Sequence, residues 1–280
     1  MALASMSEIF ERMVRNGQEF WEVVLADDMD ERQVSREASM AKMLTTWQAM
    51  QDAADSYTGR KRSVSGLVGG DGMKMRQYTF RGCAMTGGYV SEVIAEALSM
   101  AESNACMRRI VAAPTAGACG VLPAVLLPLC KYEELTQHQL LEALYVAAGI
   151  GSVIAYKASI AGASGGCQAE IGTASAMAAG ALVALRGGEG EQIGHAVAMA
   201  LKNLMGLVCD PVAGLVEVPC VKRNVIGAVN AVSAADMALA GIESRIPVDE
   251  VIDAMGEIGD ALPALSLIHI SEPTRLQLIS

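Results

Sequence analysis

Three cysteines, Cys167, Cys209 and Cys220, stand beside residues that bend or expose the backbone, in the sequences G-G-C, C-D-P and V-P-C. A cysteine that only fills a helical core needs no glycine pair or proline next to it, whereas a thiolate that points from a turn into a shared site does. The chain has no C-x-x-C pair, and the short ligand spacings of zinc sites are missing. Two interpretations stay open. The thiols are buried structural groups, or they hold an iron–sulfur cluster with one iron free to act as a Lewis acid on a substrate oxygen.

Other side chains that could carry out catalysis are few. The usable histidines are His138 and His195, so a Ser–His–Asp triad is poorly supported, and a structural role is the favoured interpretation of His195. A pyridoxal phosphate enzyme needs a Schiff-base lysine and a phosphate cradle, and the glycine fingerprints of dinucleotide and P-loop sites are absent. By residue type alone, four lysines could form the Schiff base: Lys131, Lys157, Lys202 and Lys222.

The composition of the 280 residues indicates an interior built on small side chains, because 52% are hydrophobic and only 4% are aromatic. The net charge of −10 argues against nucleic acid or a membrane surface as a partner. The longest uncharged run, residues 110–130, is broken by three prolines, and the run 143–156 is too short to span a membrane. Seven cysteines without a secretion signal indicate reduced thiols and a cytoplasmic location.

Helical patterns dominate the chain, and alternating strand patterns are scarce. Capping-box spacings at Ser5 and Thr136 predict two helix starts. Apolar periodicity predicts a long helix over residues 31–57, with a break before it at residues 27–28. We expect one all-α domain over residues 1–264, with glycine-rich loops and small-residue helix packing.

The last residues do not resemble natural protein. From Leu265 the chain reads L-S-L-I-H-I-S-E-P-T-R, which looks like a translated sequencing-library adapter. We therefore expect residues 265–280 to be a non-native tail and exclude them from the fold prediction.

Four longer segments carry a resemblance to a known family. The chain resembles the alpha chain of the iron–sulfur-dependent L-serine dehydratases (L-serine deaminases) over nearly all of residues 1–264. The last two segments are specific to that family. The segments are S-V-S-G-L-V-G-G-D (63–71), S-N-A-C-M-R-R-I-V-A-A-P-T-A-G-A-C-G-V-L-P-A-V-L (103–126), G-G-C-Q-A-E-I-G-T-A-S-A-M-A-A (165–179) and G-L-V-C-D-P-V-A-G-L-V-E-V-P-C-V-K-R-N (206–224).

The resemblance implies a reaction and a cofactor. The family converts L-serine to pyruvate and ammonia, a step of amino-acid catabolism and gluconeogenesis. Its G-G-C, C-D-P and V-P-C cysteines, here Cys167, Cys209 and Cys220, hold a [4Fe-4S] cluster. The open iron is expected to bind the substrate hydroxyl and help it leave while a base removes the α-proton.

The resemblance leaves the base and the seat of the substrate carboxylate open. By residue type, the candidates for the base are Lys157, Glu170 and His195. Two loops with freed backbone N–H groups and hydroxyls suit a carboxylate, although tight helix packing explains their glycines equally well. The candidate residues in these loops are Ser65, Gly66, Thr115 and Gly117.

The chain departs from the family pattern in three ways. Ala213 stands where the family usually has glycine. The family's own C-terminal tail is replaced from Leu265 onward, so weak activity is expected if that tail closes the site. The family's beta region, with a serine-rich motif ending in histidine, is missing. The resemblance therefore implies a separate beta chain as partner, and an oligomer.

Other functions stay open. A related family, the L-cysteine desulfidases, shares the alpha-like domain, and sulfide release from L-cysteine would indicate it. A non-catalytic helical subunit that only binds a partner would contain no iron. A pyridoxal enzyme would lose activity on borohydride treatment.

Overall fold

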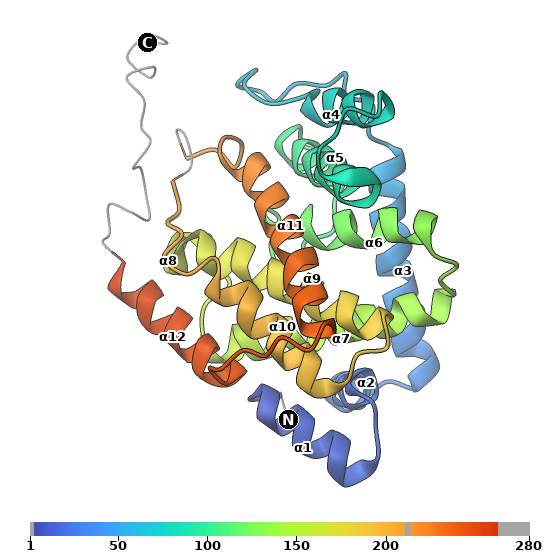
Figure 1. Ribbon diagram of the computed structural model, residues 1–280, viewed down its shortest axis with the longest axis vertical. Helices are drawn as coiled ribbons and strands as arrows, with labels where there is room; N and C mark the ends of the chain where they lie inside the picture. The colour runs from blue at the N-terminus through green and yellow to red at the C-terminus, as the bar shows by residue number, and fades with distance from the viewer. Residues whose placement is uncertain (1–2, 211–213, 263–280) are drawn as a thin grey trace.

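The structure is a computed structural model that describes residues 3–210 and 214–262, and these residues form helices and no β-strand (Figure 1). The predicted all-α fold class is confirmed. The prediction of a non-native tail falls outside the described residues. In chain order the elements, with η1 a short π-helix, are α1 (Met6–Asn16), α2 (Phe20–Arg32), α3 (Arg36–Asp55), α4 (Asp71–Phe80), α5 (Gly87–Ala105), α6 (Val121–Tyr132), α7 (Gln137–Lys157), α8 (Gly162–Cys167), η1 (Gln168–Gly172), α9 (Thr173–Leu185), α10 (Gly190–Lys202), α11 (Cys220–Leu239) and α12 (Val248–Ala261).

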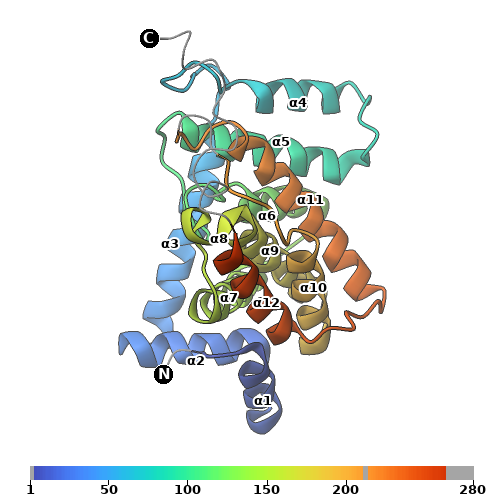
Figure 2. The same cartoon turned by 90° about the vertical axis from the view of Figure 1, so that its left-hand side faces the viewer.

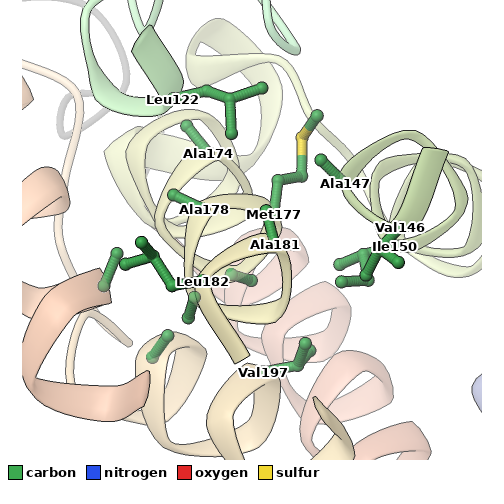
Figure 3. Close-up of a cluster of buried hydrophobic side chains, with 14 of the residues drawn as sticks. Leu122, Val146, Ala147, Ile150, Ala174, Met177, Ala178, Ala181, Leu182 and Val197 are labelled. Atoms are coloured by element: carbon green, nitrogen blue, oxygen red, sulfur yellow. The ribbon is translucent and has the colours of Figure 1, made fainter. Parts of the chain in front are cut away.

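Helix α9 lies at the centre of the molecule, surrounded by α6, α7, α10 and α11 (Figure 1). Every residue from 173 to 183 is buried, and most of them are Ala, Gly or Ser. Small side chains let the neighbouring helices approach closely. At Gly180, a Cβ atom would come within 2.2 Å of Ile150 Cδ1 on α7. Figure 3 shows the result, with Met177 and Leu182 of α9 packed among side chains of the surrounding helices.

Helix α7 is the one described helix that is long and apolar enough to cross a membrane, and 67% of its apolar stretch is buried inside the protein. It packs against α2 and α9, which accounts for its apolar composition. The helix is longer than the apolar run at 143–156 because it begins with polar residues after the capping box at Thr136, where Gln139 N donates to Thr136 Oγ1 (3.3 Å).

The predicted break at residues 27–28 is wrong. Helix α2 runs through both aspartates and ends at Arg32, where Gln33 adopts a left-handed conformation (φ 53°) and Ser35 caps α3. Asp28 is compatible with the helix interior because its carboxylate accepts a hydrogen bond from Arg32 Nη1 at 2.9 Å, one turn later. The long predicted helix over 31–57 is therefore α3 alone.

The elements around Cys167 and Cys220 are in contact with one another or with shared neighbours. Helix α12 packs against α8, and the two lie side by side in both views (Figures 1 and 2). A Cβ at Gly259 of α12 would lie 3.2 Å from Gly165 Cα of α8, so glycines set this close approach. Helix α11 and η1 are also in contact, which brings residues far apart in the sequence to one place.

Candidate active site

Cys167 and Cys209 are held together by backbone contacts between the end of α8 and the segment after α10. Gly166 adopts φ 76° just before Cys167, and a Cβ there would lie 2.8 Å from Leu207 O. Only glycine therefore allows the two segments to lie this close. Gln168 N then donates to the same Leu207 carbonyl at 2.9 Å. The two thiols lie close enough for each to shift the pKa of the other.

Cys220 is the first residue of α11, immediately after the cis Val218–Pro219 peptide. Asn224, one turn later, donates from Nδ2 to Cys220 O (3.0 Å) and to Gly117 O (2.7 Å). Its Oδ1 accepts from Gly120 N at 2.9 Å. Asn224 thus fastens the loop before α6 to the cysteine-bearing end of α11.

Arg223 connects the segments of all three cysteines. Its Nη1 donates to Cys167 Sγ (3.0 Å) and to Val208 O (2.8 Å), and it forms an ion pair with Asp210. Its side chain is only 11% exposed. We assigned no role to Arg223 from the sequence, although it follows Cys220 by three residues and therefore shares its helix face.

The pKa values of the three thiols are shifted because the thiols are partly or fully buried and lie near one another. The interaction with Cys209, together with burial, raises the pKa of Cys167, and the same interaction lowers the pKa of Cys209. Burial raises the pKa of Cys220 to about 12, and unfavourable electrostatic interactions with Cys167 and Glu170 contribute. Cys220 therefore lies within electrostatic reach of the other two sulfurs.

The described residues contain no group of three or more His, Cys, Asp and Glu side chains that forms a metal-ion site as they stand. A cubane cluster differs from a single ion, because it binds each cysteine at a separate corner and holds the sulfurs farther apart. The structure brings Cys167, Cys209 and Cys220 within electrostatic reach of one another, and their role as ligands stays a prediction.

Glu170 lies in η1, beside the thiols. Its Oε1 accepts a hydrogen bond from the Thr115 hydroxyl, and a Cβ at Gly117 would lie 2.6 Å from the same oxygen. On its other side, a Cβ at Gly162 would lie 3.1 Å from Glu170 Oε2 and 3.7 Å from Cys209 Sγ. Two glycines therefore make room for this carboxylate between the loop before α6 and Cys209. A π-helical turn at such a position is typical of functional sites.

The other two candidate bases lie elsewhere. Lys157, at the end of α7, forms ion pairs with Asp253 (3.1 Å) and Asp249 (3.6 Å) of α12. His195 is half-buried in α10 and makes no hydrogen bond or ion pair with another described residue. Of the three candidates, the structure brings only Glu170 to the thiols.

The predicted carboxylate seat at Ser65 and Gly66 holds a carboxylate of the chain itself. The hydroxyls of Ser63 (2.9 Å) and Ser65 donate to Oε2 of Glu217, a buried residue three positions before Cys220. Gly66 supplies the left-handed turn of the loop (φ 75°). No local signal marks Glu217 as the partner, because more than 150 residues separate it from the loop.

The next glycines along the same loop also receive an internal carboxylate. The backbone N–H groups of Gly70 (3.0 Å) and Asp71 (2.7 Å), at the start of α4, donate to the buried Glu102. Here Glu102 and Glu217 take the bonds that were expected for a substrate.

Comparisons with known proteins identify the family of the chain. The family described as "Serine dehydratase alpha chain" matches residues 15–265. The chain is 47% identical over 242 residues to the probable L-serine dehydratase, alpha chain, of Bacillus subtilis (86% of this chain, 81% of the relative). It is 38% identical over 261 residues to the L-serine dehydratase, alpha chain, of Peptoniphilus asaccharolyticus (93% and 89%). Escherichia coli L-serine dehydratase 2 is 47% identical over 170 residues, which are 60% of this chain and 37% of that protein. The chain therefore belongs to the serine dehydratase alpha chain family.

Proposed function

We propose that this chain is the alpha chain of an L-serine dehydratase, a lyase that converts L-serine to pyruvate and ammonia. The observation that carries the proposal is the meeting of three thiols and one carboxylate from separate segments in a chain of this family. β-Elimination of serine needs a group that accepts the α-proton and an electrophile that helps the hydroxyl leave. The carboxylate can supply the first, and a cofactor held by the thiols can supply the second.

The donor set fits a [4Fe-4S] cluster. Three cysteine sulfurs lie together, two of them buried, and Arg223 donates an N–H group to one. Thiolates are the ligands such clusters take, and N–H···S bonds are usual around them. We infer that Cys167, Cys209 and Cys220 would hold the cluster. When bound with three protein ligands, it would supply an open iron as a Lewis acid for the serine hydroxyl.

The residues of the chain perform the proton transfer. Glu170 accepts the α-proton on the oxygen that does not receive the Thr115 hydroxyl, because that hydrogen bond holds the carboxylate in one orientation. Loss of the hydroxyl then leaves aminoacrylate, which tautomerises to an imine. Water hydrolyses the imine to pyruvate and ammonia. The Thr115 loop, fixed to α11 by Asn224 at Gly117 O, thus orients Glu170, and its role as a seat for the substrate carboxylate stays a prediction.

A second chain completes the enzyme in this proposal. The two most extensively matched relatives above are named alpha chains, whereas the aligned region makes up only 37% of the E. coli protein. That protein therefore carries much additional sequence in the same polypeptide. We infer that a separate beta chain supplies the equivalent part here, and that the active enzyme is an oligomer.

The test is to co-express the chain with a serine dehydratase beta chain without oxygen and to measure iron, sulfide and pyruvate formation. Cys→Ala variants at positions 167, 209 and 220 should each lose iron and activity. Cys130→Ala is the matched control, because Cys130 bonds within its own helix to Leu126 O (3.2 Å). Variants at all three positions that keep wild-type iron and pyruvate formation would contradict the proposal.

The same preparation decides the substrate. L-Serine should give pyruvate and ammonia without another product. If L-cysteine releases sulfide faster than L-serine releases pyruvate, the chain is an L-cysteine desulfidase instead. If the anaerobic complex contains no iron and acts on neither amino acid, the chain is a non-catalytic subunit.

A further inference from the structure

We propose that Arg223 is a positioning residue that assembles the three-cysteine site before any cofactor binds. This proposal rests on the proposed function only in taking an iron–sulfur cluster as the cofactor that the site binds. One guanidinium nitrogen donates to Cys167 Sγ (3.0 Å) and to Val208 O (2.8 Å), and the same group pairs with Asp210. These contacts reach the end of α8 and both sides of Cys209, while Arg223 itself lies in the first turn of the helix that Cys220 begins.

Two other described side chains near the site join different segments. Gln168 accepts from Gly206 N (2.8 Å) and donates to Met255 O (3.1 Å), so it joins η1 to the Cys209 segment and to α12. Asn224 joins α11 to the loop before α6. Neither of them links α11 to the segment that bears Cys209, and Arg223 does.

The chemistry of the side chain suits the position. A buried cation needs partners for its charge and its N–H groups, and Arg223 finds a carboxylate, a carbonyl and a sulfur. All three contacts converge on Nη1, at the end of the guanidinium, so one nitrogen joins the three partners. A lysine side chain ends one atom short of Nη1, so its ammonium cannot occupy the same point between the three partners.

The contact to sulfur has a consequence for a bound cluster. An N–H donor to a ligand sulfur orients it and withdraws electron density, and such outer contacts hold metals in place. Loss of this donor should therefore weaken iron binding at the site. It should also let the segments that bear the three cysteines move apart.

The experiment compares Arg223→Lys and Arg223→Gln with Lys222→Gln. Lys222 is the adjacent residue, but it points to Asp71 and is 55% exposed, so its substitution removes the same charge without touching the thiols. In the metal-free chain, alkylation with iodoacetamide is followed at each cysteine by mass spectrometry. In the anaerobic complex with the beta chain, release of iron to a chelator is followed by absorbance.

We expect both Arg223 variants to speed alkylation of Cys167 and Cys209 severalfold, and to release iron roughly 10-fold faster. Lys222→Gln should match the wild type in both assays. Circular dichroism reports whether each variant folds. If Arg223→Gln does not fold, Arg223→Lys, which keeps the charge, decides the outcome.

The two proposals fail in different ways. Wild-type iron retention and alkylation rates in Arg223→Lys would overturn the positioning role while leaving the dehydratase proposal intact. A wild-type complex without iron would instead overturn the dehydratase proposal, and the alkylation pattern of the metal-free chain would still decide the role of Arg223.

Discussion

At the scale of single residues, the candidate site brings the carboxylate of Glu170 close to cysteine sulfurs. Glu170 lies within electrostatic reach of Cys209 and Cys220, and its charge contributes to the high pKa of Cys220. Thr115 fixes one carboxylate oxygen. By contrast, Lys157 forms ion pairs with Asp249 and Asp253 of α12, an arrangement typical of a structural role.

Three substitutions separate the candidate bases. Glu170→Gln should lower kcat by about 10²- to 10⁴-fold, because the amide cannot accept the α-proton, while iron content stays at the wild-type level. Lys157→Met should lower the midpoint of thermal unfolding and leave kcat/KM unchanged, and His195→Gln should change neither. The measurements are steady-state pyruvate formation and iron analysis of the anaerobic complex. Full activity in Glu170→Gln would exclude it as the base.

Sequence reasoning found the residues whose environment is local and missed those whose partners are distant. The glycine beside Cys167 and the proline beside Cys220 are visible in a short window because they bend the backbone there. Arg223 and Glu217 contact residues 56 and 152 positions away, and nothing in a short window indicates such partners.

At the scale of elements, helix starts were predictable and some helix ends were not. The Ser5 and Thr136 caps depend on atoms three residues away, and both form: Glu8 N donates to Ser5 Oγ at 3.0 Å. The break at 27–28 was predicted from the polarity of two aspartates, but partners on the same helix and on α3 satisfy Asp28. The π-helix η1 has no signature that the apolar periodicity could reveal.

The α8–η1 junction provides a prediction about backbone geometry. Gly166→Ala should lower iron binding and cost roughly 1–3 kcal/mol, because the new Cβ would be 2.8 Å from Leu207 O and must push the Cys209 segment away. Gly187→Ala is the matched control. Gly187 has a similar φ of 73° at the end of α9, but nothing lies within 4 Å of its Cβ position.

Both variants place an alanine at positive φ, but Gly166 also has ψ 175°, a region essentially restricted to glycine, so its variant adds backbone strain to the close contact. Gly187→Ala should cost about 1–2 kcal/mol from its positive φ and leave the iron content unchanged. Urea unfolding gives the stability and iron analysis gives the loading. Equal iron content in the two variants would mean that the approach of Leu207 to Gly166 does not position Cys167.

At the scale of the whole molecule, small residues at the centre determine how closely the helices pack around α9. The composition predicted this kind of packing, since Ala and Gly carry the interior, and the all-α fold class followed from the periodicity. Which glycine meets which side chain was not predictable, because it depends on the relative positions of α7 and α9. Gly180 faces Ile150, and Gly149 of α7 faces Val24 of α2 in the same way.

The contact between Gly180 and Ile150 can be tested with a double-mutant cycle. Gly180→Ala gains helix propensity of about 1 kcal/mol but places a methyl group 2.2 Å from Ile150 Cδ1, and overpacking costs about 1–3 kcal/mol. We expect a net loss of stability. Ile150→Val removes Cδ1 and alone should cost about 1 kcal/mol, because it leaves a cavity.

Combined, the two substitutions should compensate each other, because the alanine methyl group fills the space that Cδ1 leaves while the helix-propensity gain remains. The double variant should therefore be more stable than the sum of the single effects by about 1 kcal/mol or more, measured by urea unfolding with unchanged slopes. Additive effects would mean that Ile150 moves aside without cost. In that case the close packing of α7 on α9 would not depend on a glycine at position 180.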